Sequence, residues 1–80
     1  MKIKDAIVAR LIELCAQRNI RKNELANLAG LTPSTVYSVF DESRRDIGMV
    51  TVKKLCDGLE ITVTDFFDSP LFKELEQEME

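Results

Sequence analysis

The side chains of this chain that could do chemistry are hydroxyls, cations and carboxylates, and none is arranged for catalysis. Among 80 residues there is no histidine, and the two cysteines, Cys15 and Cys56, stand alone in helix-like apolar stretches. No carboxylates pair in an apolar setting, no glycine loop could cradle a phosphate, and no serine or cysteine has a base partner. We therefore expect no enzyme activity, no metal site, no cofactor and no small-molecule substrate.

A polar face and a set of cations offer hydrogen bonds and charge instead. In the segment PSTVYSVF, residues 33–40, Val36, Val39 and Phe40 recur at the three-and-four spacing of one helix face. The opposite side is small and polar: Ser34, Tyr37, Ser38 and Asp41. Four cations flank this segment in the chain: Arg21, Lys22, Arg44 and Arg45. This clustering favours contact with phosphate groups.

Helices that the apolar spacing predicts must position these side chains. We expect helices at residues 4–18, 22–29, 33–40 and 49–58. A fifth helical turn, capped by Thr62 or Thr64, holds Phe66 and Phe67. No run alternates in the manner of a strand. The sequence therefore predicts an all-α fold.

Each predicted helix has an apolar side that we expect to face a common core. In the first helix this side is Ile7, Leu11, Leu14 and Cys15, widened by Ile3, Val8 and Ile12. In the second helix the apolar and small positions are Leu25, Ala26, Leu28 and Ala29. In the fourth helix the inward residues are Met49, Val52, Leu55 and Cys56, followed by Leu59.

Turn and capping residues predict a very tight connection between the second and third helices. Gly30 is the residue type that ends a helix without a Cβ penalty. Thr32 can cap the next helix through its hydroxyl, and Pro33 suits the first helical position, where no amide hydrogen is needed. Ser69 and Pro70 repeat this signature before the acidic segment LFKELEQEME, which we expect to be helical or frayed.

Length and composition allow one small domain with a packed core. The chain has 80 residues, of which 45% are hydrophobic and 31% charged. We place a domain at residues 1–68 and treat residues 69–80 as an acidic C-terminal segment. Residues 1–54 hold ten Lys or Arg against six Asp or Glu, a balance of +4, whereas residues 55–80 hold one against eight, a balance of −7. If the acidic end points elsewhere, the basic face can attract phosphates despite a net charge of −3.

The N-terminal pattern favours neither export nor membrane insertion. No run of about 18 apolar residues occurs, and the charges of Asp5, Arg10 and Glu13 interrupt the region where a signal peptide would be apolar. We expect a cytoplasmic protein whose two cysteines are reduced and buried.

The segment NELANLAGLTPSTVYSVF, residues 23–40, combines a helix, a glycine-bearing turn and a second helix. On this motif, residues 19–67 resemble the Cro and lambda-repressor-like helix-turn-helix family, also called the XRE family. The matching positions are Glu24-Leu25-Ala26, Gly30, Leu31, Thr32 and the variable helix 33–40. Downstream, Thr51-Val52, Leu55-Cys56, Leu59 and Ile61-Thr62 resemble the fourth helix of the family and its connection to the fifth. The resemblance implies a five-helix fold and a transcriptional regulator that usually binds a two-half-site operator as a dimer.

Carried onto this chain, the resemblance implies a surface for double-stranded DNA. The base-reading candidates are Pro33, Ser34, Thr35, Tyr37 and Ser38. The phosphate candidates are Arg21, Lys22, Arg44, Arg45 and Thr51, the last beside helix-start amides that attract anions. The candidates for a dimer interface are Phe66, Phe67, Leu71 and Phe72, and the alternative is that Phe66 or Phe67 fills the core of the domain.

Three positions depart from the family pattern. The second helix begins with Lys22, where the family often has a phosphate-binding glutamine. The reading helix lacks the Arg, Gln or Asn that make bidentate base contacts, so we expect readout through hydroxyls, Tyr37 and thymine-methyl contacts from Pro33 or Thr35. Phe40 replaces a family glutamate, and we expect it to extend the core.

The leading interpretation is a repressor that occupies an operator as a homodimer, with two other roles left open. The same fold can bind a partner protein, for example as an antitoxin that neutralises a toxin, or through an acidic tail docked on a basic surface. The uncharged reading helix and the net charge of −3 favour this role. Alternatively, the acidic segment folds back and masks the basic face as a regulatory brake.

Overall fold

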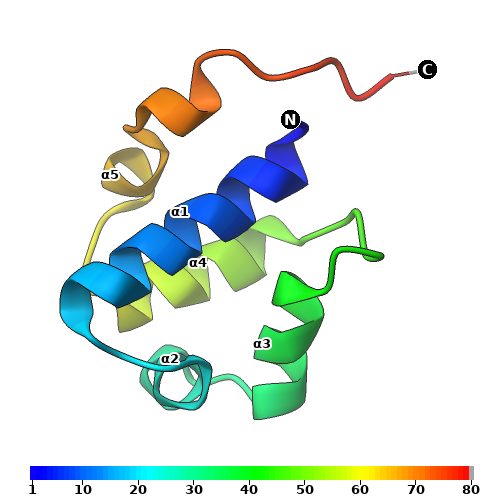
Figure 1. The fold of residues 1–80 in the computed structure, drawn as a ribbon. Coiled ribbons are helices and arrows are strands. Elements are labelled where there is room, and N and C mark those ends of the chain that lie inside the picture. The colour runs from blue at the N-terminus through cyan, green and yellow to red at the C-terminus, as the bar shows by residue number, and fades with distance from the viewer. Residues whose placement is uncertain (80) are drawn as a thin grey trace.

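A computed structural model gives the fold of residues 1–79, and the regular structure in that range is entirely helical. The elements are α1 (Ile3–Arg18), α2 (Lys22–Ala29), α3 (Pro33–Phe40), α4 (Met49–Gly58), α5 (Val63–Phe67) and a 3₁₀ turn, η1 (Pro70–Phe72). Figure 1 shows α2 and α3 at one side of the molecule and α5 with the C-terminal segment at the opposite side. The all-α, five-helix prediction is confirmed. Within the described range, every helix is too short or too polar to cross a membrane.

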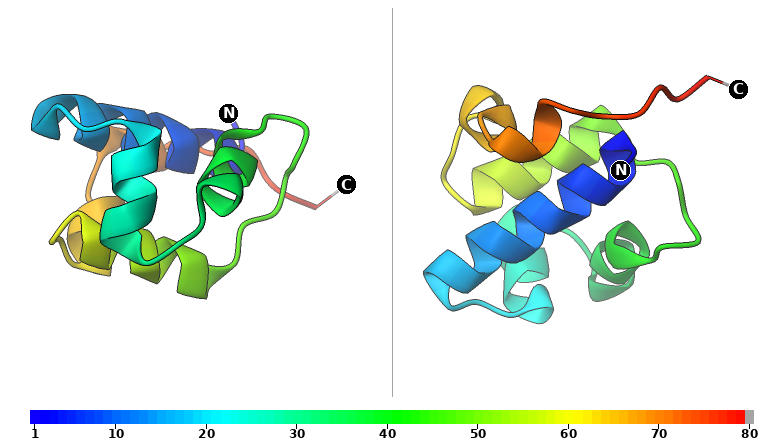
Figure 2. Two further views of the ribbon diagram at one scale, coloured as in Figure 1. Left: turned by 90° about the horizontal axis from the view of Figure 1, so that it is seen from below. Right: turned by 45° about the horizontal axis from the view of Figure 1, so that its top comes forward.

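The core collects large apolar side chains from all five α-helices. Each of these is no more than 1% exposed: Leu11, Leu25, Val36, Leu55 and Phe66. Helix α2 packs against α3 and α4, α5 packs against α4, and η1 packs against α1; Figure 2 gives two further views of this arrangement. Burial of such a side chain stabilises the fold by roughly 1.5 to 3 kcal/mol. The core therefore fixes the position of α3 relative to the other helices.

Local capping residues set the helix boundaries, as the sequence predicts. Gly30 ends α2 with a φ of 68°, in the left-handed region. The hydroxyl oxygens of Thr32 and Thr62 each accept a hydrogen bond from the amide three residues on, at 3.3 Å and 3.0 Å respectively. Ser69 caps η1 through its hydroxyl oxygen. The predicted bounds hold for α2, α3 and α4, and α1 begins one residue earlier than predicted, at Ile3.

The crossing of α2 and α4 requires a glycine on α4. A Cβ atom at Gly58 would lie 2.8 Å from the backbone nitrogen of Ala29 and 2.9 Å from the carbonyl carbon of Leu28. Ala26, one of the small positions of α2, is fully buried. The backbones of α2 and α4 can approach this closely only because residue 58 carries no side chain.

Three apolar side chains expected to face the core are exposed instead. The exposed fractions are 59% for Met49, 56% for Leu28 and 56% for Ile12. Met49 is the first residue of α4 and projects beyond the core, while Ile47 from the preceding loop packs against it. Leu28 lies outside the buried face of α2, to which Leu25 belongs. Apolar spacing locates a helix face to within about one residue, and these side chains fall at its edges.

The C-terminal segment runs beside the start of α1 without regular secondary structure. Between η1 and residue 79 it is not helical, so of the two expected states, helical or frayed, the helical one is absent there. The Glu76 amide donates to the Met1 carbonyl at 3.1 Å, and the Glu76 carboxylate lies 2.9 Å from the Met1 ammonium. The Glu78 carboxylate accepts a hydrogen bond from the Ile3 amide at 3.1 Å. Because α1 has free amides at its start, a carboxylate is a favourable partner there.

The beginning of the same segment packs into the domain. Ser69 is 7% exposed, and Phe72 packs against the core cluster. The predicted domain at residues 1–68 therefore shares its core with residues just beyond it.

Candidate nucleic-acid interface

Helices α2 and α3 and the turn at Gly30 form the helix-turn-helix that the sequence predicts. On the inner side of α3, Val36 is fully buried and Val39 is 5% exposed. This packing turns the other side of α3 outward. Of the base-reading candidates, three are exposed and two are partly buried: Pro33, Ser34 and Tyr37, then Thr35 and Ser38.

The hydroxyls at the start of α3 are linked to one another through Thr32. The Thr32 Oγ1 atom accepts from the Thr35 amide and lies 2.8 Å from Thr35 Oγ1 and 3.1 Å from Ser34 Oγ. Thr32 has one proton and two lone pairs, and the amide takes one lone pair. The other lone pair can accept from only one neighbouring hydroxyl, while the Thr32 proton goes to the other. Either Ser34 or Thr35 therefore keeps a free proton for an outside acceptor.

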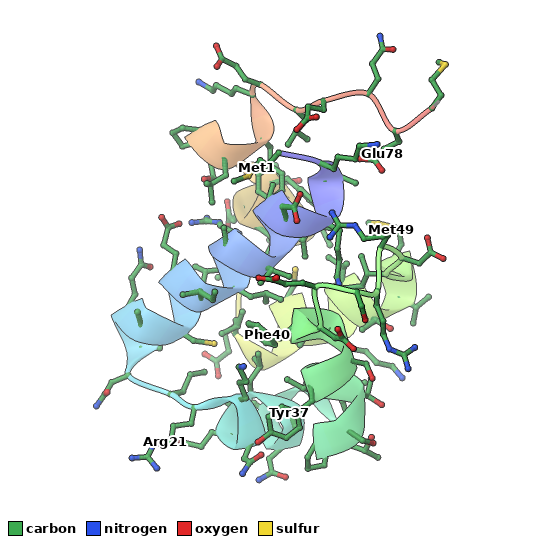
Figure 3. The ribbon with its side chains drawn as sticks, turned by 45° about the vertical axis from the view of Figure 1, so that its right-hand side comes forward. Met1, Arg21, Tyr37, Phe40, Met49 and Glu78 are labelled. Carbon is green, nitrogen blue, oxygen red and sulfur yellow. The ribbon has the colours of Figure 1, made fainter. Side chains whose placement is uncertain are left out.

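Tyr37 is joined to α2 by a residue that the sequence analysis missed. Its hydroxyl donates a hydrogen bond to Asn23 Oδ1 at 3.2 Å, and its side chain is 51% exposed. Figure 3 shows Tyr37 on α3 beside α2. Asn23 is the second residue of α2. No spacing rule connects residues that are 14 positions apart in two helices, so only the tertiary fold reveals this pair.

Lys22 is held over two aromatic rings. Its Nζ atom lies 4.5 Å from the centroid of the Phe40 ring and 5.8 Å from that of Tyr37. Phe40 is partly buried and packs against the core cluster, as expected. Arg21 is exposed, and its backbone amide donates to Glu24 Oε1 at 3.3 Å. Two cations therefore flank the start of α2, next to the outer side of α3.

Lys4, also missed by the sequence analysis, fixes the loop between α3 and α4 at residues 41–48. It is 2% exposed, and its Nζ atom donates to the carbonyl oxygens of Asp41 at 3.2 Å and Arg44 at 2.7 Å. Burial, followed by the charge of Arg45, lowers the pKa of Lys4. A signal was present in the sequence, since Lys4 precedes the inward-facing Ile7 by three positions.

The two arginines of this loop differ in how they are held. Arg44 is 65% exposed at its side chain and lies 3.9 Å from Asp41, a weak ion pair. Arg45 lies 3.0 Å from Asp5 on α1 and also donates to the carbonyl oxygen of Glu42 at 3.0 Å. The Lys2 amide and then the Arg45 guanidinium lower the pKa of Asp5. Arg44 is therefore free to meet an incoming anion, whereas Arg45 must leave Asp5 first.

The start of α4 offers backbone amides rather than side chains. Its capping residue is Gly48, which supplies no side-chain hydrogen bond, and Thr51 in the first turn is partly buried. Helix-start amides without a side-chain cap attract anions. This end of α4 follows directly on the loop that carries Arg44 and Arg45.

The aromatic residues considered for a dimer interface form a cluster within the domain. The ring centroids are 5.0 Å apart for Phe66 and Phe67, and 4.9 Å apart for Phe67 and Phe72. Phe66 is completely buried, so its side chain fills the core and offers no surface to a partner. The Arg10 side chain on α1 also donates a hydrogen bond to the Phe66 carbonyl oxygen at 2.8 Å. Partly buried side chains remain as interface candidates: Phe67, Leu71 and Phe72.

The two cysteines are free thiols at separate places in the fold. Cys56 is buried and Cys15 is half-buried, and burial raises the pKa of both thiols. Within residues 1–79, no three His, Cys, Asp or Glu side chains come together in a way that could hold a metal ion.

Known proteins resemble the part of the chain that contains this interface. A family model described as a Cro/C1-type HTH DNA-binding domain matches residues 10–70. The crystal structure of the prophage Lp1 protein 11 is similar at 38% sequence identity with a TM-score of 0.81, covering 94% of this chain and 100% of that one. The curated proteins give no match. Because the family match spans well over half of its residues, this chain belongs to the family of Cro/C1-type helix-turn-helix DNA-binding domains.

Proposed function

We propose that this chain is a sequence-specific transcriptional repressor that binds its operator as a homodimer and excludes other proteins from that DNA. The observation that carries the proposal is the exposed, uncharged outer side of α3, bordered by cations at the start of α2 and in the loop 41–48. A small polar helix face can enter a major groove about 12 Å wide. The flanking cations are placed to contact the phosphates on either side of that groove.

Each candidate residue has a role in this proposal. Reading of base edges falls to Pro33, Ser34, Thr35, Tyr37 and Ser38. Anchoring to phosphates falls to Arg21, Lys22, Arg44, Arg45 and Thr51. Exposure supports Arg21, Lys22 and Arg44 as first contacts, whereas Arg45 exchanges its Asp5 partner for a phosphate.

Selection of bound duplexes from a random DNA pool, followed by salt titration, tests this function. Each cation that contacts a phosphate should contribute about 0.9 to the slope of log affinity against log salt. Arg21→Gln, Lys22→Gln and Arg44→Gln should each reduce the slope by about one such contact. Lys54→Gln, an exposed lysine on α4, serves as a control that should leave the slope unchanged. A wild-type slope near zero would contradict phosphate anchoring.

The homodimer needs a separate test. Recognition helices of such dimers lie about 34 Å apart, one turn of DNA. Changing the spacing between selected half-sites by about 5 base pairs should then abolish cooperative binding, since the half-sites would face opposite sides of the duplex. Leu71→Glu should shift the protein toward the monomer in sedimentation equilibrium, and Leu71 is the interface candidate that does not pack on the core cluster. If the monomer binds a single half-site with the affinity of the wild type for the full operator, the homodimer is refuted.

A second candidate function is binding of a partner protein, for example as an antitoxin. It is favoured by an apolar hollow where α1 faces the start of α2 and the end of α3, lined by Ile12, Cys15, Ile20 and Phe40. Ile12 is 56% exposed there. The double substitution of Arg44 and Arg45 by Glu should abolish DNA retention but leave a protein partner bound, so it separates the two functions.

A regulatory brake by the acidic segment is favoured by the position of Glu78. Its side chain lines the same hollow as Arg45 and Met49, close to the start of α4. Deletion of residues 73–80 should then tighten DNA binding by removing carboxylates from this neighbourhood. Unchanged affinity after the deletion would eliminate the brake.

A further inference from the structure

We infer that Tyr37 recognises an exocyclic amino group of a base, the N6 amino group of adenine or the N4 amino group of cytosine, and that Asn23 imposes this choice. The inference rests on the proposed function, in which α3 lies in the major groove. It concerns one residue pair, Tyr37 and Asn23, and identifies the chemical group that the pair reads.

The hydrogen-bond inventory of Tyr37 carries the first step. A tyrosine hydroxyl has a single proton, and here that proton is donated to Asn23 Oδ1 at 3.2 Å. The oxygen keeps lone pairs that can still accept. Because Tyr37 is 51% exposed and its hydrogen bond to Asn23 is itself exposed, an external donor can reach this oxygen. In the bound pair, Tyr37 therefore acts as an acceptor.

The groups of duplex DNA carry the second step. Phosphate oxygens, guanine N7 and O6, adenine N7 and thymine O4 are all acceptors in or beside the major groove. The donors there are the amino groups of adenine and cytosine. An acceptor on α3 therefore discriminates in favour of base pairs that present an amino group at its position. A tyrosine with a free proton would have no such preference.

The surroundings of the pair hold it in place. Asn23 sits in the first turn of α2, and Tyr37 lies on α3, so the tight turn at Gly30 fixes the distance between them. The Lys22 ammonium lies 5.8 Å from the centroid of the Tyr37 ring and restricts its movement on that side. The hydroxyls of Ser34 and Thr35 differ from that of Tyr37, because their shared bonds to Thr32 leave one of their protons available to a DNA acceptor.

Amino-group deletion in the DNA tests the inference directly. In the selected operator, each adenine is replaced in turn by nebularine, which lacks the N6 amino group, and each cytosine by 2-pyrimidinone, which lacks the N4 amino group. The wild-type protein should lose about three- to tenfold in affinity at one position, as expected for one hydrogen bond. Tyr37→Phe, which keeps the ring beside Lys22, should lose nothing further at that position. The analogue that produces the effect shows whether adenine or cytosine is read.

Two variants of Asn23 separate its role from general folding. Asn23→Leu removes the acceptor and frees the tyrosine proton, so at that position the variant should bind base pairs that present an acceptor nearly as well as those that present an amino group, while circular dichroism stays unchanged. Asn23→Asp keeps an acceptor oxygen, so it should lower overall affinity through its charge but retain the dependence on the amino group.

Specific outcomes would overturn the inference. If no removal of an amino group weakens binding of the wild type more than binding of Tyr37→Phe, the inference is refuted and the proposed function stays intact. If 7-deazaguanine, which lacks the N7 acceptor, weakens the wild type more than Tyr37→Phe instead, the tyrosine donates its proton to the base. Failure of the wild-type protein to select any duplex would refute the proposed function itself.

Discussion

Lys4 places a charged ammonium inside the protein, where its role is to hold backbone rather than to meet an anion. Its two carbonyl partners belong to the loop that carries Arg44 and Arg45. Asp5, the next residue, pairs with Arg45. At the scale of single residues, the start of α1 therefore controls how the cations of the loop 41–48 are presented.

Replacement of Lys4 by Met should loosen this loop. The methionine keeps an apolar stem in the buried site, but the Asp41 and Arg44 carbonyl groups each lose the hydrogen bond from the Lys4 ammonium. We expect a loss of about 1 to 3 kcal/mol in the free energy of unfolding, measured by urea denaturation. The salt slope of DNA binding should fall by about one contact as well, because Arg44 is no longer positioned. Lys54→Met is the matched control, and an unchanged slope in Lys4→Met would show that Lys4 acts on stability alone.

Replacement of Asp5 by Asn should increase DNA affinity, because Arg45 is then released to bind phosphate. The measurement is a steeper salt slope than that of the wild type.

The same variant tests the lowered pKa of the Asp5 carboxyl group. Because the folded-state pKa of Asp5 lies below 3.8, its stabilising contribution is present above that pH and is lost as the pH falls through the lowered value. The difference in melting temperature between wild type and Asp5→Asn should therefore shrink in acid, and a constant difference would contradict the pairing.

At the scale of elements, the sequence predicts what is decided locally and misses what is decided between helices. The bounds of α2, α3 and α4 are predictable because Gly30 and Thr32 act on their own neighbours through backbone geometry. The prediction for Met49 is wrong because its exposure depends on whether Ile47 or Met49 packs against the core cluster. The outward face of α3, proposed to read bases, follows from helix periodicity, whereas the contact between Asn23 and Tyr37 requires the relative position of α2 and α3.

Gly58→Ala should be strongly destabilising for its size, since the added methyl group meets the backbone of α2 rather than a flexible side chain. We expect a loss of roughly 1 to 3 kcal/mol in the free energy of unfolding, as for other overpacked sites. Gly48→Ala provides the control, because its Cβ would meet only Thr51 Oγ1, at 4.0 Å. Equal stability of the two variants in urea denaturation would show that α2 and α4 can separate without cost.

At the scale of the whole molecule, the separation of charge reconciles a net charge of −3 with DNA binding. The acidic C-terminal segment lies along the start of α1, and Figure 1 places it at the side opposite α2 and α3. Screening over about 10 Å in physiological salt weakens its effect on the outer side of α3. The loop 41–48 lies nearer to this segment, as the shared hollow of Glu78 and Arg45 indicates.

The contact between the two ends of the chain should depend on pH from both sides. The pKa of Glu76 is lowered from 4.5, so its contribution is present above that value and is lost as the pH falls. The pKa of the Met1 ammonium is raised from 8.0, so its contribution is present below that value and is lost as the pH rises. The melting temperature of Glu76→Gln should therefore differ most from that of the wild type between 4.5 and 8.0. Glu74→Gln is the control, and equal effects of the two variants would exclude the pairing.

The two hydrogen bonds of the Lys4 ammonium also limit which changes of loop length the chain can tolerate. Its acceptors, the carbonyl groups of Asp41 and Arg44, are three residues apart. The Arg44 amide donates to the Asp41 carbonyl at 3.1 Å and so fixes this turn. An inserted or deleted residue between them would move one carbonyl out of reach. Among homologous sequences, we therefore expect lysine at this position to coincide with a constant loop length, and loss of the lysine to accompany insertions.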